Sequence, residues 1–342
     1  MSEISFTFGK KKDIDKIMEF LSKNWKKDHI LANNKELFEY EYLTDIGLNI
    51  GLANVNNKIV GIFGFKTYSE SSSPDIAGSL WVISKECKIP FAGLKLREFV
   101  INNIPHNCFA APGAVLDTMP IYKMLGVGWS KMNHFVLLNK TIKNFNIAHV
   151  PDSHILQTKS KFEFDKEIQI KEIESFSDIV EFNFPKYNIY YPYKDGAYLQ
   201  KRFFEHPFYK YKVLAFYNPD TKIIKSLIVC REVQANEAQA LSIVDFYGDE
   251  NMIANLSVYF SKNLSYSKKY EYLDFLSLGI SKDILIGSGF IDVNSNIGLI
   301  IPKYFEPFEK KNRSTYAVYD LCKNRILRQF KADGDQDRPN II

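Results

Sequence analysis

The sequence predicts an α+β protein with two similar lobes in tandem, each a mostly antiparallel mixed sheet flanked by helices. Its 342 residues exceed the size at which one hydrophobic core keeps growing, which favours two domains. Strand-like and helix-like apolar patterns interleave along both halves. A short segment also recurs, because residues 58–65 (KIVGIFGF) resemble residues 222–229 (KIIKSLIV) at an offset near half the chain length.

This repeat places the join between the halves near residue 150. We therefore expect an N-terminal lobe at residues 1–150 and a C-terminal lobe at residues 151–342, whose acidic tail at residues 331–342 docks onto the protein. Hydrophobic residues make up 46% of the chain and aromatic residues 15%. These shares are typical of a well-packed globular protein.

The first half is predicted to have the order β-α-α-β-β-β-α-β-α-β. Period-two alternation predicts its strands, and apolar residues at helical spacing predict its helices. In chain order we expect a strand at 4–8, a helix capped by Asp13, a helix around Leu37 and Phe38, strands at 48–55, 58–66 and 77–84, a helix bearing Leu96, Val100 and Ile104, a strand at 108–115, a short helix at 117–125 and a closing strand at 130–138.

The second half is predicted to repeat this scaffold. We expect a strand at 168–173, a helix at 199–204, strands at 211–217, 222–231 and 239–246, a helix at 252–262 and a strand at 271–278. The helix end at residues 122–127 (YKMLGV) matches residues 285–290 (LIGSGF), but its tyrosine does not recur. Any chemistry that needs this tyrosine therefore belongs to the first half.

The charge of the chain argues against a nucleic-acid partner. Lys and Arg number 44 against 40 Asp and Glu, and the net charge is only +4. Basic and acidic residues are mostly interleaved, which gives no nucleic-acid footprint. A few lysines could still attract a small phosphorylated ligand.

The four cysteines, Cys87, Cys108, Cys230 and Cys322, are scattered without metal-ligand spacing. We expect no metal, no disulfide and reduced thiols. The N-terminus shows no basic segment followed by an apolar stretch, and no apolar run approaches the roughly 18–20 residues that span a bilayer. The expected location is the cytoplasm.

A junction between a turn and a helix at residues 88–95 (KIPFAGLK) stands out as an anion site. The start of a helix presents backbone N–H groups and a positive dipole end. Such a junction suits phosphate. Its counterpart in the second half, residues 247–251 (YGDEN), carries two carboxylates that would repel phosphate.

This element order, with Tyr122 before the last strand, resembles the GNAT superfamily of acyl-CoA-dependent N-acyltransferases. In that superfamily a loop of pattern Gln/Arg-x-x-Gly-x-Gly/Ala binds the coenzyme A pyrophosphate through its amides. Here Phe91 replaces the middle glycine and Pro90 removes one donor. The residues that the resemblance implies for acetyl-CoA or another short acyl-CoA are Lys88, Phe91, Ala92, Gly93, Leu94 and Lys95, with Val82 and Ile83 on the fourth strand.

The resemblance also implies how the reaction proceeds. A neutral amine attacks the thioester directly, so catalysis needs positioning, an oxyanion donor and proton transfer. The oxyanion donor would be a backbone N–H near Val82 or Ile83, and Tyr122 would protonate the leaving thiolate. A thiol has a pKa of about 8.5 and a tyrosine about 10, so this transfer is feasible. The alternative for Tyr122 is a packing role.

Two further positions are candidates for the acceptor side. His29 follows a helix bearing Trp25, and its imidazole could take the amine proton; a surface or structural histidine is the alternative. Asp245, followed by Phe246, ends an apolar strand and could orient the acceptor or act as a base through water. The alternative for Asp245 is a loop cap.

The C-terminal tail alternates Asp333, Asp335 and Asp337 with small or polar residues. The pattern lacks the glycine position and distal Glu of a calcium loop. We expect the tail, with Lys331 and Arg338, to dock in the cleft between lobes and aim carboxylates at an ammonium group or sugar hydroxyls. A disordered tail is the alternative.

Tandem lobes of this kind are similar to those of the Fem family of peptidoglycan aminoacyltransferases. Three segments, residues 25–31 (WKKDHIL), 202–207 (RFFEHP) and 330–340 (FKADGDQDRPN), resemble GNAT-type proteins found among bacterial surface-polysaccharide biosynthesis genes. That resemblance implies N-acylation, most simply N-acetylation, of an amino sugar attached to a nucleotide.

The expected function is therefore acyl transfer to an amino sugar, with coenzyme bound by the first lobe. Two alternatives stay open. One is a non-catalytic scaffold that binds a sugar intermediate or a partner enzyme, which Phe91 in the loop would support. The other is Fem-like aminoacyl transfer from tRNA, which the weak basicity disfavours. The sequence is also compatible with a homodimer.

Overall fold

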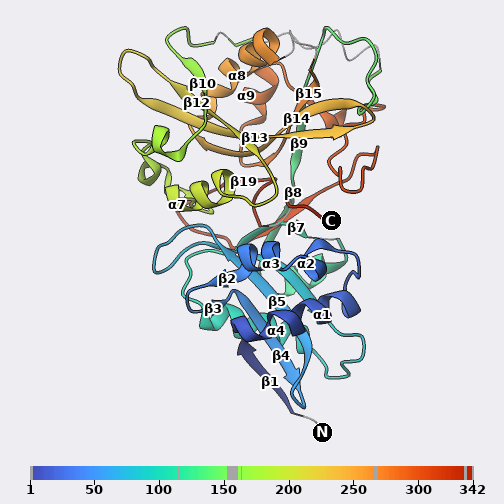
Figure 1. Ribbon diagram of the computed structural model, residues 1–342. Helices are drawn as coiled ribbons and strands as arrows, with labels where there is room; N and C mark the ends of the chain where they lie inside the picture. Colours follow the sequence, from blue (N-terminus) through green and yellow to red (C-terminus); the bar gives the residue numbers. More distant parts are fainter. Residues whose placement is uncertain are drawn as a thin grey trace.

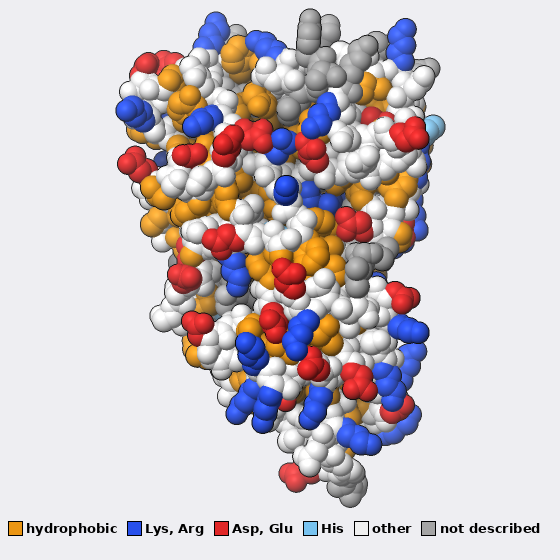
Figure 2. All heavy atoms as spheres, viewed as in Figure 1, with side chains coloured by type: hydrophobic (Ala, Val, Ile, Leu, Met, Phe, Trp, Pro, Cys, Tyr) orange, Lys and Arg blue, Asp and Glu red, His pale blue; other side chains and the backbone are white. Residues whose placement is uncertain are grey.

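The computed structural model describes residues 3–114, 116–151, 161–162, 164–264, 269–334 and 337–340. It has two lobes stacked end to end, with the N-terminus at the far end of the first lobe and the C-terminal residues between the lobes (Figure 1). Hydrophobic side chains gather across the middle of the face seen in Figure 2, where the lobes meet. Among the described residues, no helix has the length and apolar character needed to cross a membrane.

The first lobe contains a four-stranded antiparallel sheet of order β1-β4-β5-β6. Apolar residues of α1, α2 and α3 pack on one face of the sheet, and those of α4 pack on the other. The bounds are β1 (Ile4–Phe8), α1 (Ile14–Asn24), α2 (Ile30–Asn33), α3 (Lys35–Tyr42), β2 (Leu43–Thr44), β3 (Gly47–Leu48), β4 (Ile50–Val55), β5 (Lys58–Thr67), β6 (Ile76–Ile83), α4 (Ala92–Asn103), β7 (Ala110–Ala114), α5 (Met119–Met124) and β8 (Gly128–Lys131).

The second lobe contains a larger mixed sheet whose main path has the order β10-β12-β13-β14-β15-β9-β16, with β19 paired to β15. Its largest core cluster packs α8 and α9 against this sheet. The bounds are β9 (Asn133–Leu138), β10 (Gln169–Ile173), β11 (Tyr190–Tyr191), α7 (Gly196–Leu199), β12 (Tyr211–Tyr217), β13 (Ile224–Ala235), β14 (Ala238–Gly248), α8 (Ile253–Tyr259), β15 (Tyr270–Leu278), α9 (Lys282–Gly287), β16 (Ile291–Asp292), β17 (Tyr316–Tyr319), β18 (Ile326–Leu327) and β19 (Gln329–Phe330).

The two lobes exchange a strand. The predicted closing strand at 130–138 is in fact two strands, β8 and β9, with Met132 between them. β8 stays with the first lobe, whereas β9 pairs with β15 and β16 of the second lobe. In return, β17 from the second half lies between β7 and β8. The prediction of one strand closing the first sheet is wrong, because alternation identifies a strand but not its partner.

The expectation of four reduced thiols is also wrong. Cys108, just before β7, forms a disulfide with Cys322, just after β17, across 214 residues of sequence. The strand exchange brings these two positions together, which spacing along the chain does not reveal. Cys87 and Cys230 are free.

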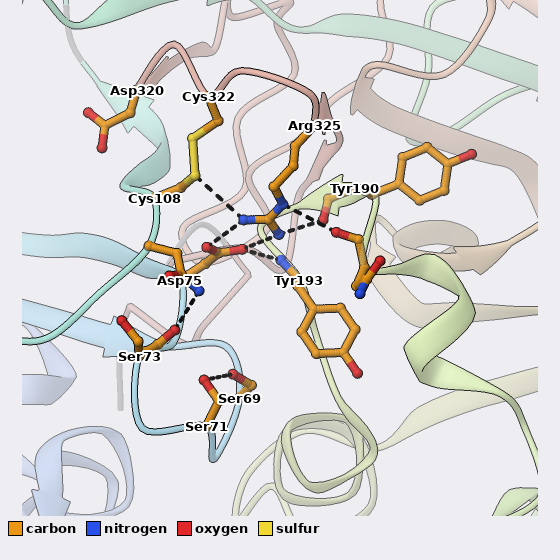
Figure 3. Close-up of polar contacts among 12 residues, drawn as sticks. Ser69, Ser71, Ser73, Asp75, Cys108, Tyr190, Tyr193, Asp320, Cys322 and Arg325 are labelled. Carbon is orange, nitrogen blue, oxygen red and sulfur yellow. Dashed lines mark hydrogen bonds and ion pairs between the residues drawn. A yellow bond between two sulfur atoms is a disulfide. The ribbon is translucent and has the colours of Figure 1, made fainter.

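Beside the disulfide lies a polar junction between the lobes (Figure 3). Arg325 makes a two-pronged contact with Asp75, at 2.9 and 2.7 Å, and also donates to the carbonyls of Tyr190 and Asn188. Asp75 in turn accepts from the backbone N–H of Tyr193 at 2.6 Å. This network fixes the start of β6 against the second half of the chain.

Candidate active site

The candidate site begins where β6 and β7 separate. The Ile76 N–H donates to the Cys108 carbonyl at 2.9 Å, and Ile76 and Phe109 form a parallel bridge. Beyond this bridge, β6 continues in the four-stranded sheet and β7 enters the sheet with β17 and β8. The gap between them opens into a cavity of about 1230 Å³, with residues 78–83 on one wall and 111–114 on the other.

The N-terminus of α4 faces this cavity. Phe91, Ala92, Gly93 and Leu94 all line it, and the first N–H groups of a helix have no partner within the helix. The Trp81 indole N–H donates to the Gly93 carbonyl at 3.2 Å, which fixes the helix start against β6. A Cβ at position 93 would lie only 3.2 Å from Ile83 Cγ1 and from Trp81 Nε1, so the glycine allows the start of α4 to approach β6 closely.

Phe91 has a left-handed backbone, with φ of 58° and ψ of 19°. That conformation costs a residue other than glycine about 1–2 kcal/mol. The loop therefore keeps a glycine-like geometry although glycine is absent. The Phe91 side chain is 72% exposed and lines the cavity. Lys88 and Lys95 are exposed beside the helix start, outside the cavity lining.

Tyr122 lies on α5 and lines the same cavity. Its ring packs edge-to-face with that of Trp81, with centroids 6.1 Å apart. Burial raises the pKa of the Tyr122 phenol, and the charge of Arg97 acts in the opposite direction. Val82 and Ile83 also line the cavity, and β6 is the last strand of its sheet. An edge strand has backbone groups that are free for a ligand.

The other end of the cavity combines three distant segments. Trp25, Lys26 and His29 come from the first lobe, and Arg338 and Asn340 from the C-terminal tail. Five more lining residues come from the connection between β16 and β17: Tyr304, Glu306, Pro307, Glu309 and Arg313. We did not identify this connection from the sequence. Its aromatic and charged residues form no motif, and only the strand exchange brings them to the first lobe.

His29 is held in place by both ring nitrogens. Nδ1 accepts the Leu31 N–H at 3.1 Å, which caps α2, and Nε2 lies 3.3 Å from Asn340 Oδ1. Nε2 therefore carries the proton and has no lone pair for an acceptor amine. Burial lowers the pKa of His29 to about 3, and Arg338 adds to this effect. The geometry gives the predicted acid–base role no support.

Asp245 and Phe246 lie outside the cavity lining. Phe246 packs in the core of the second lobe. Asp245 is fully buried and accepts from Lys194 Nζ at 2.6 Å; the same Nζ lies 2.5 Å from Asp333 Oδ1. Burial raises the pKa of Asp333 to about 7; Asp245 adds to the rise and Lys194 opposes it. Lys194 thus joins Asp245 to Asp333 of the tail, and neither carboxylate lines the cavity.

The described residues of the tail are mostly buried, and among the predicted tail residues that the structure describes, Arg338 alone lines the cavity. Asp337 is buried, with Arg231 Nε at 2.9 Å and the Tyr211 hydroxyl at 3.0 Å. Burial would raise the pKa of Asp337, but Arg231, Lys331 and Arg202 outweigh it and hold it below its ordinary value. Lys331 is buried 4.0 Å from Asp337. Asp335 lies outside the described residues.

No group of three or more His, Cys, Asp or Glu residues within the described ranges could hold a metal ion. What the first lobe offers is an open strand edge, a helix start, and a buried phenol on one cavity. This combination can bind an extended anionic ligand and donate a proton to an atom beside Tyr122.

No family model matches the sequence, and no curated protein matches it. Solved structures do match. A protein from Pyrococcus horikoshii assigned as an acetyltransferase aligns over 97% of this chain and 95% of its own, with a TM-score of 0.52 and 9% identity. A GCN5-related N-acetyltransferase from Anabaena variabilis aligns over 93% and 73%, with a TM-score of 0.55 and 9% identity.

A third match is the GCN5-related glucosamine N-acetyltransferase region of a fungal multi-domain GH3 beta-N-acetylglucosaminidase. It has a TM-score of 0.51 and 10% identity, and covers 93% of this chain and 38% of the fungal one. Identities this low speak to the fold alone. The chain has the fold of GCN5-related N-acetyltransferases, including the two separating strands and the helix start beside the cavity.

Proposed function

We propose that the protein is an acyl-CoA-dependent N-acyltransferase whose coenzyme site is the gap between β6 and β7. One observation carries this proposal: the open strand edge, the start of α4 and Tyr122 all face a single cavity. The start of α4 suits a pyrophosphate, because its first N–H groups have no partner within the helix and its residues 91–94 line the cavity. Lys88 and Lys95 add positive charge nearby.

Acyl-CoA would supply the activated acyl group as a thioester. The residues of the chain would do the rest. Backbone N–H groups of β6 near Val82 or Ile83 donate to the oxygen on which negative charge develops. Tyr122 donates its proton to the sulfur that leaves. Its buried ring, packed on Trp81, keeps the hydroxyl in one position for that transfer.

We further propose an amino sugar, attached to a nucleotide, as the acceptor. The support is threefold: the resemblance to proteins of surface-polysaccharide biosynthesis, the fold shared with a glucosamine N-acetyltransferase region, and the lining of the acceptor end. That end carries aromatic rings for a sugar face and charged groups for its substituents. Trp25 and Tyr304 provide the rings, and Arg338 and Lys26 provide positive charge suited to a phosphate.

The first test is isothermal titration with acetyl-CoA and with desulfo-CoA. We expect micromolar binding, weakened about 100-fold in Gly93→Asp because a carboxylate at the start of α4 would repel the pyrophosphate. Asn102→Asp adds the same charge at the exposed far end of α4 and should bind normally. Tyr122→Phe should bind coenzyme but lose turnover with an amine acceptor.

A non-catalytic scaffold is the second candidate, and the strained, exposed Phe91 in the coenzyme loop favours it. Absence of heat with both coenzyme ligands would support this candidate and contradict acyl transfer. Acyl transfer to free or nucleotide-linked amino sugars can be measured through release of the CoA thiol. Turnover with any of these amines would contradict the scaffold.

A further inference from the structure

The two exchanged strands are connected very differently. β8 and β9 are separated by one residue, Met132, whereas β16 and β17 are separated by residues 293–315. The longer connection crosses from the second lobe to the first and lines the acceptor end of the cavity with five residues. Part of the acceptor wall is therefore built by a long connection, whereas the corresponding connection between β8 and β9 is a single residue.

Two carboxylates of this connection line the cavity, and their surroundings differ. Glu309 is engaged by Arg313 through both oxygens, at 2.7 and 2.5 Å, and Lys311 lies 3.5 Å away. Its negative charge is thus matched by neighbours on the same segment. A carboxylate so paired has little capacity left to bind a cationic ligand.

Glu306 is held on one side only. Its Oε2 accepts the Tyr209 hydroxyl at 2.5 Å, while the contact of Oε1 with Arg231 is longer, at 3.8 Å. Arg231 Nε is already committed to Asp337 at 2.9 Å. The Glu306 side chain is 36% exposed and lines the cavity. One carboxylate oxygen is thus fixed by the protein and the other is available to a ligand.

We propose that Glu306 is the catalytic carboxylate of the acceptor site: it binds the ammonium group of the acceptor and receives the proton that the nitrogen must lose. This inference rests on the proposed function. His29 cannot take that proton, because both its nitrogens are occupied. Among the described residues, the charged and titratable groups around Glu306 and along this end of the cavity include Tyr209, Arg231, Asp337, Lys331, Arg338, Lys26, His29, Tyr304, Glu309 and Arg313.

The proton count closes with these residues. The acceptor arrives as R–NH3⁺ and gives one proton to Glu306. The neutral nitrogen forms the C–N bond, the C–S bond breaks, and Tyr122 protonates the sulfur. The nitrogen then loses its second proton, which restores the Tyr122 phenol through solvent, and Glu306 releases its own proton to solvent. The sum is an amide, a thiol and one proton from an ammonium ion and a thioester.

The test compares Glu306→Gln with Glu309→Gln, using acetyl-CoA and the amine that turns over best in the amino-sugar panel. At pH 7, kcat/KM for the amine should fall about 100-fold in Glu306→Gln, as expected for loss of a proton acceptor. It should fall less than about 3-fold in Glu309→Gln. In Glu306→Gln the deficit should shrink to less than about 10-fold at pH 9, where the amine itself is increasingly neutral. Coenzyme affinity should be unchanged in both.

Tyr209→Phe separates this role from a structural one. It removes the hydrogen bond to Glu306 but keeps the carboxylate, so turnover should stay within about 5-fold of the wild type. A loss in Tyr209→Phe as large as that in Glu306→Gln, or a deficit that does not change with pH, would overturn the assignment while leaving acyl transfer intact. Failure of the wild type to acylate any amine, despite binding acetyl-CoA, would overturn the proposed function as well.

Discussion

In the first lobe two separating strands leave an open cavity, whereas in the second lobe the chain fills the equivalent gap with its own C-terminal residues. β14 and β15 run parallel as far as Ile243 and Phe275, and then β15 pairs with β19 instead. The Ala332 N–H donates to the Val244 carbonyl at 2.8 Å, which ties the tail to β14. The Phe330 ring stacks on Phe275, with centroids 5.7 Å apart.

The starts of α4 and α8, the corresponding helices of the two lobes, also differ in what lies in front of them. In the first lobe the residues before α4 face a cavity. In the second lobe the residues before α8 are instead contacted by Arg328, between β18 and β19, which donates to the Gly248 carbonyl at 3.0 Å and to Glu250 at 3.2 Å. One scaffold thus serves as a candidate binding site in one lobe and as an anchor for the tail in the other. An empty gap leaves room for a ligand, whereas a gap filled by the chain itself holds the tail.

The largest expected effect comes from releasing the tail. Asp337→Ala would leave Arg231, Lys331 and Arg202 clustered without their buried counter-ion, which should lower the free energy of unfolding by about 3–5 kcal/mol. Denaturant unfolding measures this. Glu181→Ala removes an exposed carboxylate and should change stability by less than about 0.5 kcal/mol. Equal effects of the two substitutions would mean that the tail does not hold the second lobe together.

The next effect concerns the wall of the open gap. The disulfide ties the start of β7 to the segment after β17, so Cys322→Ser should lower the free energy of unfolding by about 2–4 kcal/mol. Cys87→Ser, at an unpaired cysteine, should have much less effect. Titration of thiols in denatured, unreduced protein should count two. A count of four would show that Cys108 and Cys322 are not joined by a disulfide.

The last effect depends on pH and tests the charges that the tail buries in the second lobe. The pKa of Asp333 is about 7, above its ordinary 3.8, so the folded protein binds this proton more tightly than the unfolded chain. This contribution to stability is complete below about pH 4 and is lost as the pH rises to about 7.

Asp333→Asn should remove this loss while keeping the Lys194 contact. The difference between the wild-type and variant unfolding curves from pH 4 to 8 isolates the effect. The difference is needed because His29 and His206, whose pKa values burial lowers to about 3, give the opposite slope below about pH 6.5. Parallel curves would show that Asp333 is not protonated in the folded protein near neutrality.

Local pattern was enough to predict most elements of both lobes. The strands at 4–8 and 58–66, for example, match β1 and β5, and the helix bearing Leu96 and Val100 is α4. Alternation and helical spacing depend on which face is buried, and each sheet has two well-defined faces. The start of α4 was predicted for the same reason, because a turn followed by an apolar helical pattern is a local signal.

Pairing between distant segments could not be predicted. Either sheet offers an apolar edge that suits β9 or β17, and nothing in residues 133–138 selects the second lobe. The predicted boundary near residue 150 stays a prediction, although β9 precedes it and lies in the second sheet. Glu306, Tyr304 and the disulfide were missed for this reason. Asp245 was misjudged because a strand end pointed to a cavity that the tail in fact fills.

The exchanged strand also bears on how the protein is made. The backbone N–H of Phe109, just before β7, donates to the carboxylate of Asp320, which lies 211 residues further along the chain. At a synthesis rate of about 5–20 residues per second, the first lobe waits roughly 10–40 s for β17 to leave the ribosome. Until then β7 and β8 present open strand edges, which are sites of aggregation. Without β17 the sheet that contains β7 and β8 stays incomplete, so the nascent chain depends on a strand from its second half to close its first lobe.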